Sequence, residues 1–246
     1  MKKLSVLLLL PLLALLLGPE TAAAQTLSLD LGAEGSTTGT IVQLIALITV
    51  LSLAPSILVM MTAFTRIVVV LSFLRSAMGI QQTPPNSVMI SLALFLTLFI
   101  MMPVLERVYD EALVPLINED VTEMEALDLA TAPVRGFMLG HVREQDLGLF
   151  LELSDSPEIA TPEETPMRAL IPAFMISELR RAFEIGFLLF LPFLVIDMVV
   201  ASVLMSMGMM MLPPILISLP FKLIFFVMVD GWYLVAGSLV QSYGGG

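Results

Sequence analysis

The sequence predicts an all-α membrane protein with two long helical hairpins and an acidic helical insertion between them. The chain has 246 residues, of which 58% are hydrophobic, and its mean hydropathy is +0.98. Several apolar segments reach the roughly 20 residues that a helix needs to cross a bilayer. The acidic residues gather instead in one polar segment between the apolar ones. A soluble fold could not bury this much apolar surface, so a membrane environment is expected.

The first 40 residues predict a secretory signal followed by a flexible lead-in. Lys2 and Lys3 precede an apolar run that is too short to span a bilayer, and three small alanines at 22–24 match a cleavage site. Residues 1–24 are therefore expected to be a signal peptide, with an uncleaved anchor as the alternative. Residues 25–40 form the lead-in.

Residues 41–105 predict the first hairpin. The apolar run 41–74 is broken by Pro55 and Arg66 and exceeds one crossing. It should therefore bend, continue past the bilayer or be partly buried in protein. The pair Pro84-Pro85 marks a turn, and residues 88–105 form the second apolar helix.

Residues 106–168 hold the excess negative charge of the chain. They contain 15 acidic and 4 basic side chains and account for the whole net charge of −11. Two short amphipathic helices are expected within them, at 123–130 and 134–153. Arg66 and Arg75 flank the first turn, which places that turn in the cytoplasm and the acidic region outside it. An acidic chain also disfavours a nucleic-acid partner, which needs basic residues.

Residues 169–243 predict the second hairpin. Its first helix is expected to begin near Ser177, whose hydroxyl could cap it, and the returning helix is expected at 215–239. The pair Arg180-Arg181 opposes the charge rule that sets the orientation. This conflict indicates that protein partners, rather than lipid alone, hold these helices.

A methionine-rich tip joins the two arms of this second hairpin. Methionine is unbranched and polarizable, so it can seal against surfaces of varying shape. The tip could act as a deformable gasket, or its methionines could simply fill gaps between helices. The tip consists of Met205, Met207, Gly208, Met209, Met210, Met211, Pro213 and Pro214.

Among the charged side chains within the apolar helices are Arg66, Glu178, Asp197, Lys222 and Asp230. A charge at the centre of a membrane helix costs about 2.5–3.5 kcal/mol on insertion scales, so each needs a partner or water. If the second hairpin folds back about its tip, Asp197 and Lys222 lie at equal height. An ion pair between them is one interpretation, and a proton or ion relay is the other.

The chain offers little for catalysis or metal binding. It has no cysteine and a single histidine, His141, which is most simply a surface residue. An intramembrane protease would need two adjacent carboxylates. Asp230 lies eight residues beyond Lys222, about 12 Å along a helix, and so not at the height of Asp197. No cofactor, no metal and no enzymatic activity are expected.

Two long segments carry a family resemblance. Residues 172–187 (PAFMISELRRAFEIGF) and 219–232 (LPFKLIFFVMVDGW) resemble the signature of the FliP family of flagellar biosynthetic proteins. Residues 60–67 and the Pro-Pro-Asn turn at 84–86 also match. The resemblance extends over about residues 41–243.

The resemblance implies a core subunit of the flagellar type III export gate in the bacterial inner membrane, within the flagellar basal body. It implies a pentamer that assembles with FliQ, FliR and other export apparatus proteins into a helical, funnel-like complex. Unfolded export substrates would pass through it, and Met209, Met210 and Met211 would form a ring that closes the pore. The alternatives are a paralogous gate subunit of a virulence secretion system, an ion-coupled transporter that uses Asp197, and the intramembrane protease.

Overall fold

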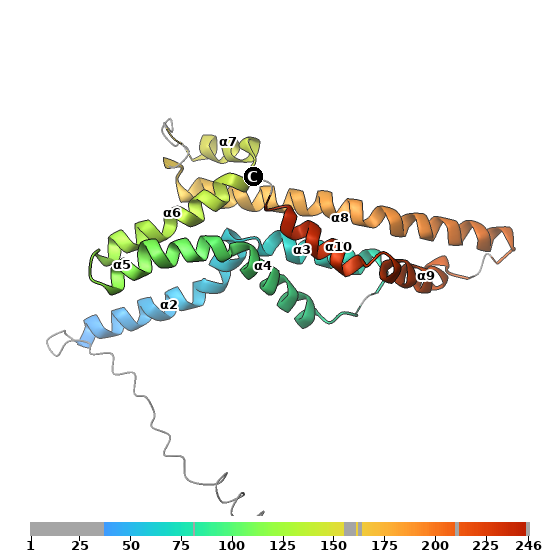
Figure 1. Cartoon of the computed structure of the whole chain (residues 1–246), viewed down its shortest axis with the longest axis horizontal. Helices are drawn as coiled ribbons and strands as arrows, with labels where there is room; N and C mark the ends of the chain where they lie inside the picture. Colours follow the sequence, from blue (N-terminus) through green and yellow to red (C-terminus); the bar gives the residue numbers. More distant parts are fainter. Residues whose placement is uncertain (1–36, 81, 155–160, 162–163, 210–211, 245–246) are drawn as a thin grey trace, which may run out of the picture. The chain divides into compact units, whose positions relative to one another are not determined.

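The computed structural model describes residues 37–80, 82–154, 161, 164–209 and 212–244, and the regular elements of these residues are helices (Figure 1). The predicted signal peptide, the lead-in up to residue 36, Met210 and Met211 lie outside the described residues. The chain forms two compact units, residues 1–52 and 53–246. All contacts discussed below lie in the second unit.

The long apolar run at 41–74 bends sharply. Helix α2 (Thr37–Met61) ends two residues before α3 (Phe64–Ala77), and the segment Pro55–Met61 makes an angle of 80° with α3. The Thr65 hydroxyl donates to the Val59 carbonyl at 2.7 Å across this bend. The bend turns one face of α3 inward, where it packs against α8 and α4.

The second apolar helix is longer than expected. Helix α4 (Asn86–Val108) continues through the π-helical turn η1 (Tyr109–Leu113) into α5 (Val114–Ile117). Together they form a 32-residue apolar candidate for a membrane span, Asn86–Ile117. The predicted end at residue 105 is wrong because the next acidic residues face outward on a helix that remains continuous.

The acidic region folds into two further helices with a different boundary from the predicted one. Helix α6 (Glu123–His141) runs through Pro133, and α7 (Glu144–Leu153) begins after a break at 142–143. At this break the backbone N–H of Arg143 donates to the Ser177 hydroxyl at 3.0 Å, so a tertiary contact sets the boundary. Helix α6 packs on α4, η1 and α8, and α7 packs on α8.

Helix α8 (Met167–Ser206) spans 40 residues, and its predicted start near Ser177 is wrong. It begins directly after Pro166, and Ser177 lies buried within it. The Ser177 hydroxyl oxygen lies 2.9 Å from the Ala173 carbonyl and 2.6 Å from Asp146 Oδ2, and its single proton is donated to one of these two acceptors at a time. A serine in a helix interior commonly bonds to the carbonyl four residues back, so the same residue type does not by itself identify a cap.

The returning arm is also broken, where one helix was expected. Helix α9 (Pro214–Met228) and α10 (Gly231–Gln241) meet at 62°. Asp230 adopts a left-handed backbone, with φ of 52°, which ends the helix there. At Gly231 an added Cβ would lie 2.2 Å from the Phe226 ring, so only glycine allows this close approach.

Two described helices are each long and apolar enough to cross a membrane. One is the continuous helix Asn86–Ile117, formed by α4, η1 and α5, and the other is α8. The described part of the chain holds up to four spans if Pro55–Met61 with α3, and α9 with α10, each count as one bent span. The fold is therefore all-helical with two to four candidate spans.

Candidate functional site

The two arms of the second hairpin meet at a charged pair. Lys222 Nζ, on α9, donates to Asp197 Oδ2, on α8, at 2.6 Å. The Lys222 side chain is 5% exposed and that of Asp197 is 33% exposed. The structure thus brings together the two charges that the sequence places at equal height.

Two further groups that were not expected from the sequence complete this pair. The Ser218 hydroxyl donates to Asp197 Oδ1 at 2.5 Å. Lys222 also donates to the carbonyl of Ala77 at 3.2 Å. Ser218 lies four residues before Lys222 and so shares its helix face. This spacing is visible in the sequence and could have identified Ser218 as a partner of the pair.

The Ala77 contact joins the two hairpins. Ala77 is the last residue of α3, and carbonyls at a helix C-terminus carry partial negative charge. Lys222 therefore lies between one full and one partial negative charge. This arrangement stabilises a buried ammonium group and links the end of α3 to the hairpin of α8 and α9.

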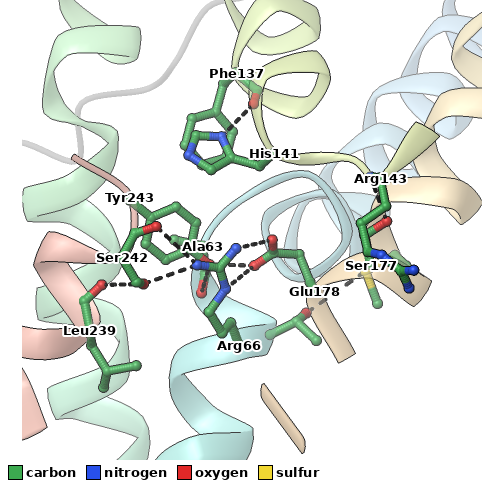
Figure 2. Close-up of polar contacts among 12 residues, drawn as sticks. Ala63, Arg66, Phe137, His141, Arg143, Ser177, Glu178, Leu239, Ser242 and Tyr243 are labelled. Carbon is green, nitrogen blue, oxygen red and sulfur yellow. Dashed lines mark hydrogen bonds and ion pairs between the residues drawn. The ribbon is translucent and has the colours of Figure 1, made fainter. Parts of the chain in front are cut away.

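A second buried cluster forms around Arg66 of α3 (Figure 2). Its guanidinium makes a two-pronged contact with the Glu178 carboxylate of α8, and one prong, from Nε to Oε2, measures 2.9 Å. Arg66 Nη1 also donates to the Ser242 hydroxyl at 2.9 Å. The Tyr243 ring lies 3.8 Å from the guanidinium carbon, and the Tyr243 hydroxyl donates to Glu178.

This cluster, which we call the Arg66 cluster, consists of Arg66, Glu178, Ser242 and Tyr243. Arg66 and Glu178 are fully buried, and a buried ion pair is favourable only when further hydrogen bonds satisfy both groups. Ser242 and Tyr243 supply those bonds and hold the end of α10 against α3 and α8. From the sequence, Arg66 and Glu178 could be identified only as separate charges, because they are 112 positions apart.

The remaining predicted residues lie elsewhere. His141 is half-buried rather than a plain surface residue, with its ring 4.6 Å from that of Phe137 and 5.0 Å from that of Tyr243. Asp230 belongs to neither charged cluster and forms the break between α9 and α10. The part of the chain that the structure describes holds no group of three or more potential metal ligands.

The methionine tip follows the end of α8. Met205, Met207 and Met209 are exposed there. Gly208 has a φ of +75°, a conformation that glycine adopts without steric cost. Pro213 and Pro214 then lead into α9, with Pro214 as its first residue. Met210 and Met211 fall outside the described residues, so the structure gives no position for two of the three predicted gasket methionines.

Apolar helices with inward-facing paired charges define the class of this protein, a helical membrane protein of several candidate spans. Residues 47–239 match the FliP family. The flagellar biosynthetic protein FliP of Caulobacter vibrioides is 62% identical over 226 residues, which cover 92% of this chain and 85% of that protein.

Two other bacteria have similar proteins of the same name. The Pectobacterium carotovorum protein is 56% identical over 202 residues, 82% of this chain and 78% of the relative. The Bacillus subtilis protein is 54% identical over 202 residues, 82% of this chain and 91% of the relative. The chain belongs to the FliP family. It is a flagellar biosynthetic protein, a component of the flagellar export apparatus, and not an enzyme.

Proposed function

We propose that the chain is a pore-forming core subunit of the flagellar type III export gate, which passes unfolded flagellar proteins across the bacterial inner membrane. The observation that supports this most is the contrast between the tip and its arms. The arms are joined by the ion pair of Asp197 and Lys222, whereas the tip presents exposed methionines. Fixed arms that carry a deformable tip suit a gate that must close and still admit varied chains.

In this proposal several copies surround a central axis, and each contributes one tip. Five copies, with FliQ and FliR, would form the funnel-like assembly that the family resemblance implies. The outward faces of α8 and α9 carry exposed apolar side chains that neighbouring subunits would cover, among them Phe183, Phe187, Val199, Phe221 and Ile224. The charges stay within each subunit and leave these faces free for apolar contact.

The gate itself would be a ring formed by Met209, Met210 and Met211. Thioether side chains make no fixed hydrogen bonds, so they can seal against one another and yield to a passing peptide. The positive φ of Gly208 lets the chain turn at the end of α8. The acidic region 106–168 would lie outside the cytoplasm.

Replacing Met209, Met210 and Met211 together by alanine tests the gasket. Each change removes most of a side chain, so we expect the closed complex to conduct small ions while it still assembles. The conductance of the purified complex in a planar bilayer measures this effect. A single Met209→Leu should have a small effect because it nearly conserves volume.

Met124→Ala is the matched control. Met124 is 70% exposed in the first turn of α6, in the acidic region and not in the tip, so its loss should leave the bilayer conductance unchanged. A triple variant as impermeable as the parent would show that the tip methionines only pack, and the gasket would have to be abandoned.

A further inference from the structure

An apolar groove runs between α10 and the helices beneath it. Its first part, of about 300 Å³, lies among Val70 of α3, Ile185 of α8 and Leu239 of α10. Its second part, of about 240 Å³, reaches Phe193 of α8 and Phe225 of α9. The two parts share three lining residues, Leu189, Leu234 and Val235. They therefore form one continuous groove along α8.

Arg181 lies on α8 one helical turn before Ile185, the first α8 residue that lines the groove. Residues four apart share a helix face, so Arg181 extends the groove-facing side of α8 toward the start of that helix. Arg181 is half-buried and has no hydrogen-bond or ion-pair partner among the described residues. It is also close enough to Tyr243 for its charge to act on the phenol.

The acidic groups near Arg181 are already engaged. Glu178, three residues earlier, binds Arg66 and Tyr243. Glu184, three residues later, pairs with Arg180 at 3.0 Å. Among the described residues the positive charge of Arg181 thus has no counter-charge of its own, one helical turn before an apolar groove. This arrangement suits a ligand with an anionic head and an apolar tail.

The length of the groove indicates which ligand of this kind fits. From Arg181 to Phe193 the helix advances about 18 Å, at 1.5 Å per residue. The tails of one lipid leaflet cover about 15 Å, half of the hydrocarbon core. Guanidinium groups bind phosphate oxygens in a two-pronged geometry that ammonium groups cannot match.

We propose that this groove binds an acyl chain of an anionic phospholipid whose phosphate contacts Arg181. Such a lipid would fill the apolar space between α10 and the neighbouring helices α3, α8 and α9. It also explains an arginine that the charge rule for membrane topology does not accommodate. This lipid site is separate from the methionine tip and does not depend on the proposed gate.

Photo-crosslinking in nanodiscs tests the site. The assembled complex, purified from membranes, is placed in phosphatidylcholine nanodiscs that contain phosphatidylglycerol with a diazirine on its acyl chain. We expect crosslinks at residues 185–193 of α8 and 234–239 of α10, located by mass spectrometry. The same diazirine on phosphatidylcholine should label the groove more weakly.

Charge variants show whether Arg181 selects the lipid. Arg181→Gln should lower the phosphatidylglycerol labelling about fivefold, the effect of one basic residue at an anionic membrane surface. Arg181→Lys should retain much of it. Arg180→Gln is the matched control and should change nothing, because Arg180 is paired and exposed. Ser238→Phe should block labelling by filling the groove.

Three results would overturn the proposal. Equal labelling by the two lipids would show an unselective apolar surface. Unchanged labelling in Arg181→Gln would remove the headgroup contact. A groove that stays unlabelled, while a cysteine at Leu188 crosslinks to a second copy of the chain, would identify a subunit interface instead.

Discussion

The Lys222 ammonium group is bound inside the second hairpin by two oxygens, one from Asp197 and one from the Ala77 backbone. The two partners of the pair are not equally buried. Lys222 is 5% exposed at its side chain, whereas Asp197 is 33% exposed and also accepts from Ser218. Removal of one partner should therefore have a different effect from removal of the other.

Asp197→Asn should be the more harmful change. It leaves a buried ammonium group with one neutral partner, and loss of one member of a buried pair costs up to about 3–5 kcal/mol. Lys222→Met should cost less, because water and Ser218 can still solvate the partly exposed carboxylate. Native mass spectrometry after mild heating gives the fraction of complex that remains assembled and so measures both effects.

Asp230→Asn serves as the control for this pair, since asparagine also tolerates the left-handed backbone found there. It should assemble as the parent does. Equal losses for Asp197→Asn and Lys222→Met would contradict the asymmetry. An Asp197→Asn complex that assembles normally yet exports nothing would favour a proton relay over a structural pair.

The sequence could predict the Asp197–Lys222 pair but not the Arg66 cluster, and the reason is local geometry. A fold-back about one short tip fixes which residues of its two arms face each other. Arg66 and Glu178 belong to different hairpins, so their meeting depends on how α3 packs on α8. The contributions of Ser242 and Tyr243 depend further on the break at Asp230, for which the sequence carried no recognised signal.

At the scale of helices, the position of a helix end can depend on contacts with other parts of the chain. The pattern of polar and apolar residues predicted two helices in the acidic region. The contact of Arg143 with Ser177 determines where α6 ends and α7 begins. The start of α6 is different because its stabilisation is local. The Thr122 hydroxyl accepts from the Glu125 N–H, and the Glu125 carboxylate accepts from the Thr122 N–H at 2.9 Å.

This capping box predicts a pH dependence for α6. Hydrogen bonds from the Thr122 backbone, and then from its hydroxyl, lower the pKa of Glu125 from its ordinary value of 4.5. A carboxyl whose pKa is lower in the folded state stabilises that state above its unfolded pKa. This stabilisation is lost as the pH falls below 4.5 and through the lowered pKa. The protection factor against hydrogen exchange at the first turn of α6 should therefore fall on acidification.

Glu125→Gln provides the control, because glutamine can also accept the bond in a capping box but does not titrate. Its exchange protection should be independent of pH across the same interval, after correction for intrinsic rates. Thr122→Ala should weaken the helix start at every pH, by about 1 kcal/mol for a lost N-cap. A parent protein with the same flat profile as Glu125→Gln would refute this assignment.

For the whole molecule, orientation in the membrane is the property that the proposed function requires. The first turn carries Arg75, and the acidic region carries the excess negative charge of the chain. We expect the turn in the cytoplasm and the acidic region on the periplasmic side. Two to four candidate spans are compatible with this arrangement.

Single-cysteine variants report this orientation without interference, because the chain has no cysteine of its own. Asp120→Cys lies at an exposed position of the acidic region and Ser76→Cys at an exposed position near the first turn. In cells with a permeabilised outer membrane, an impermeant thiol reagent should label Asp120→Cys and leave Ser76→Cys unlabelled. The opposite pattern would invert the topology.

The two buried basic residues also differ in the order in which their partners are synthesised. Ala77, Asp197 and Ser218 all precede Lys222, so a chain growing from its N-terminus has made every one of these groups when Lys222 emerges. Arg66 emerges early, whereas Glu178, Ser242 and Tyr243 come far later. During biosynthesis the Arg66 guanidinium therefore lacks its Ser242 partner until 176 further residues have been made. A nascent chain that stalls before residue 242 keeps an incompletely satisfied arginine in α3.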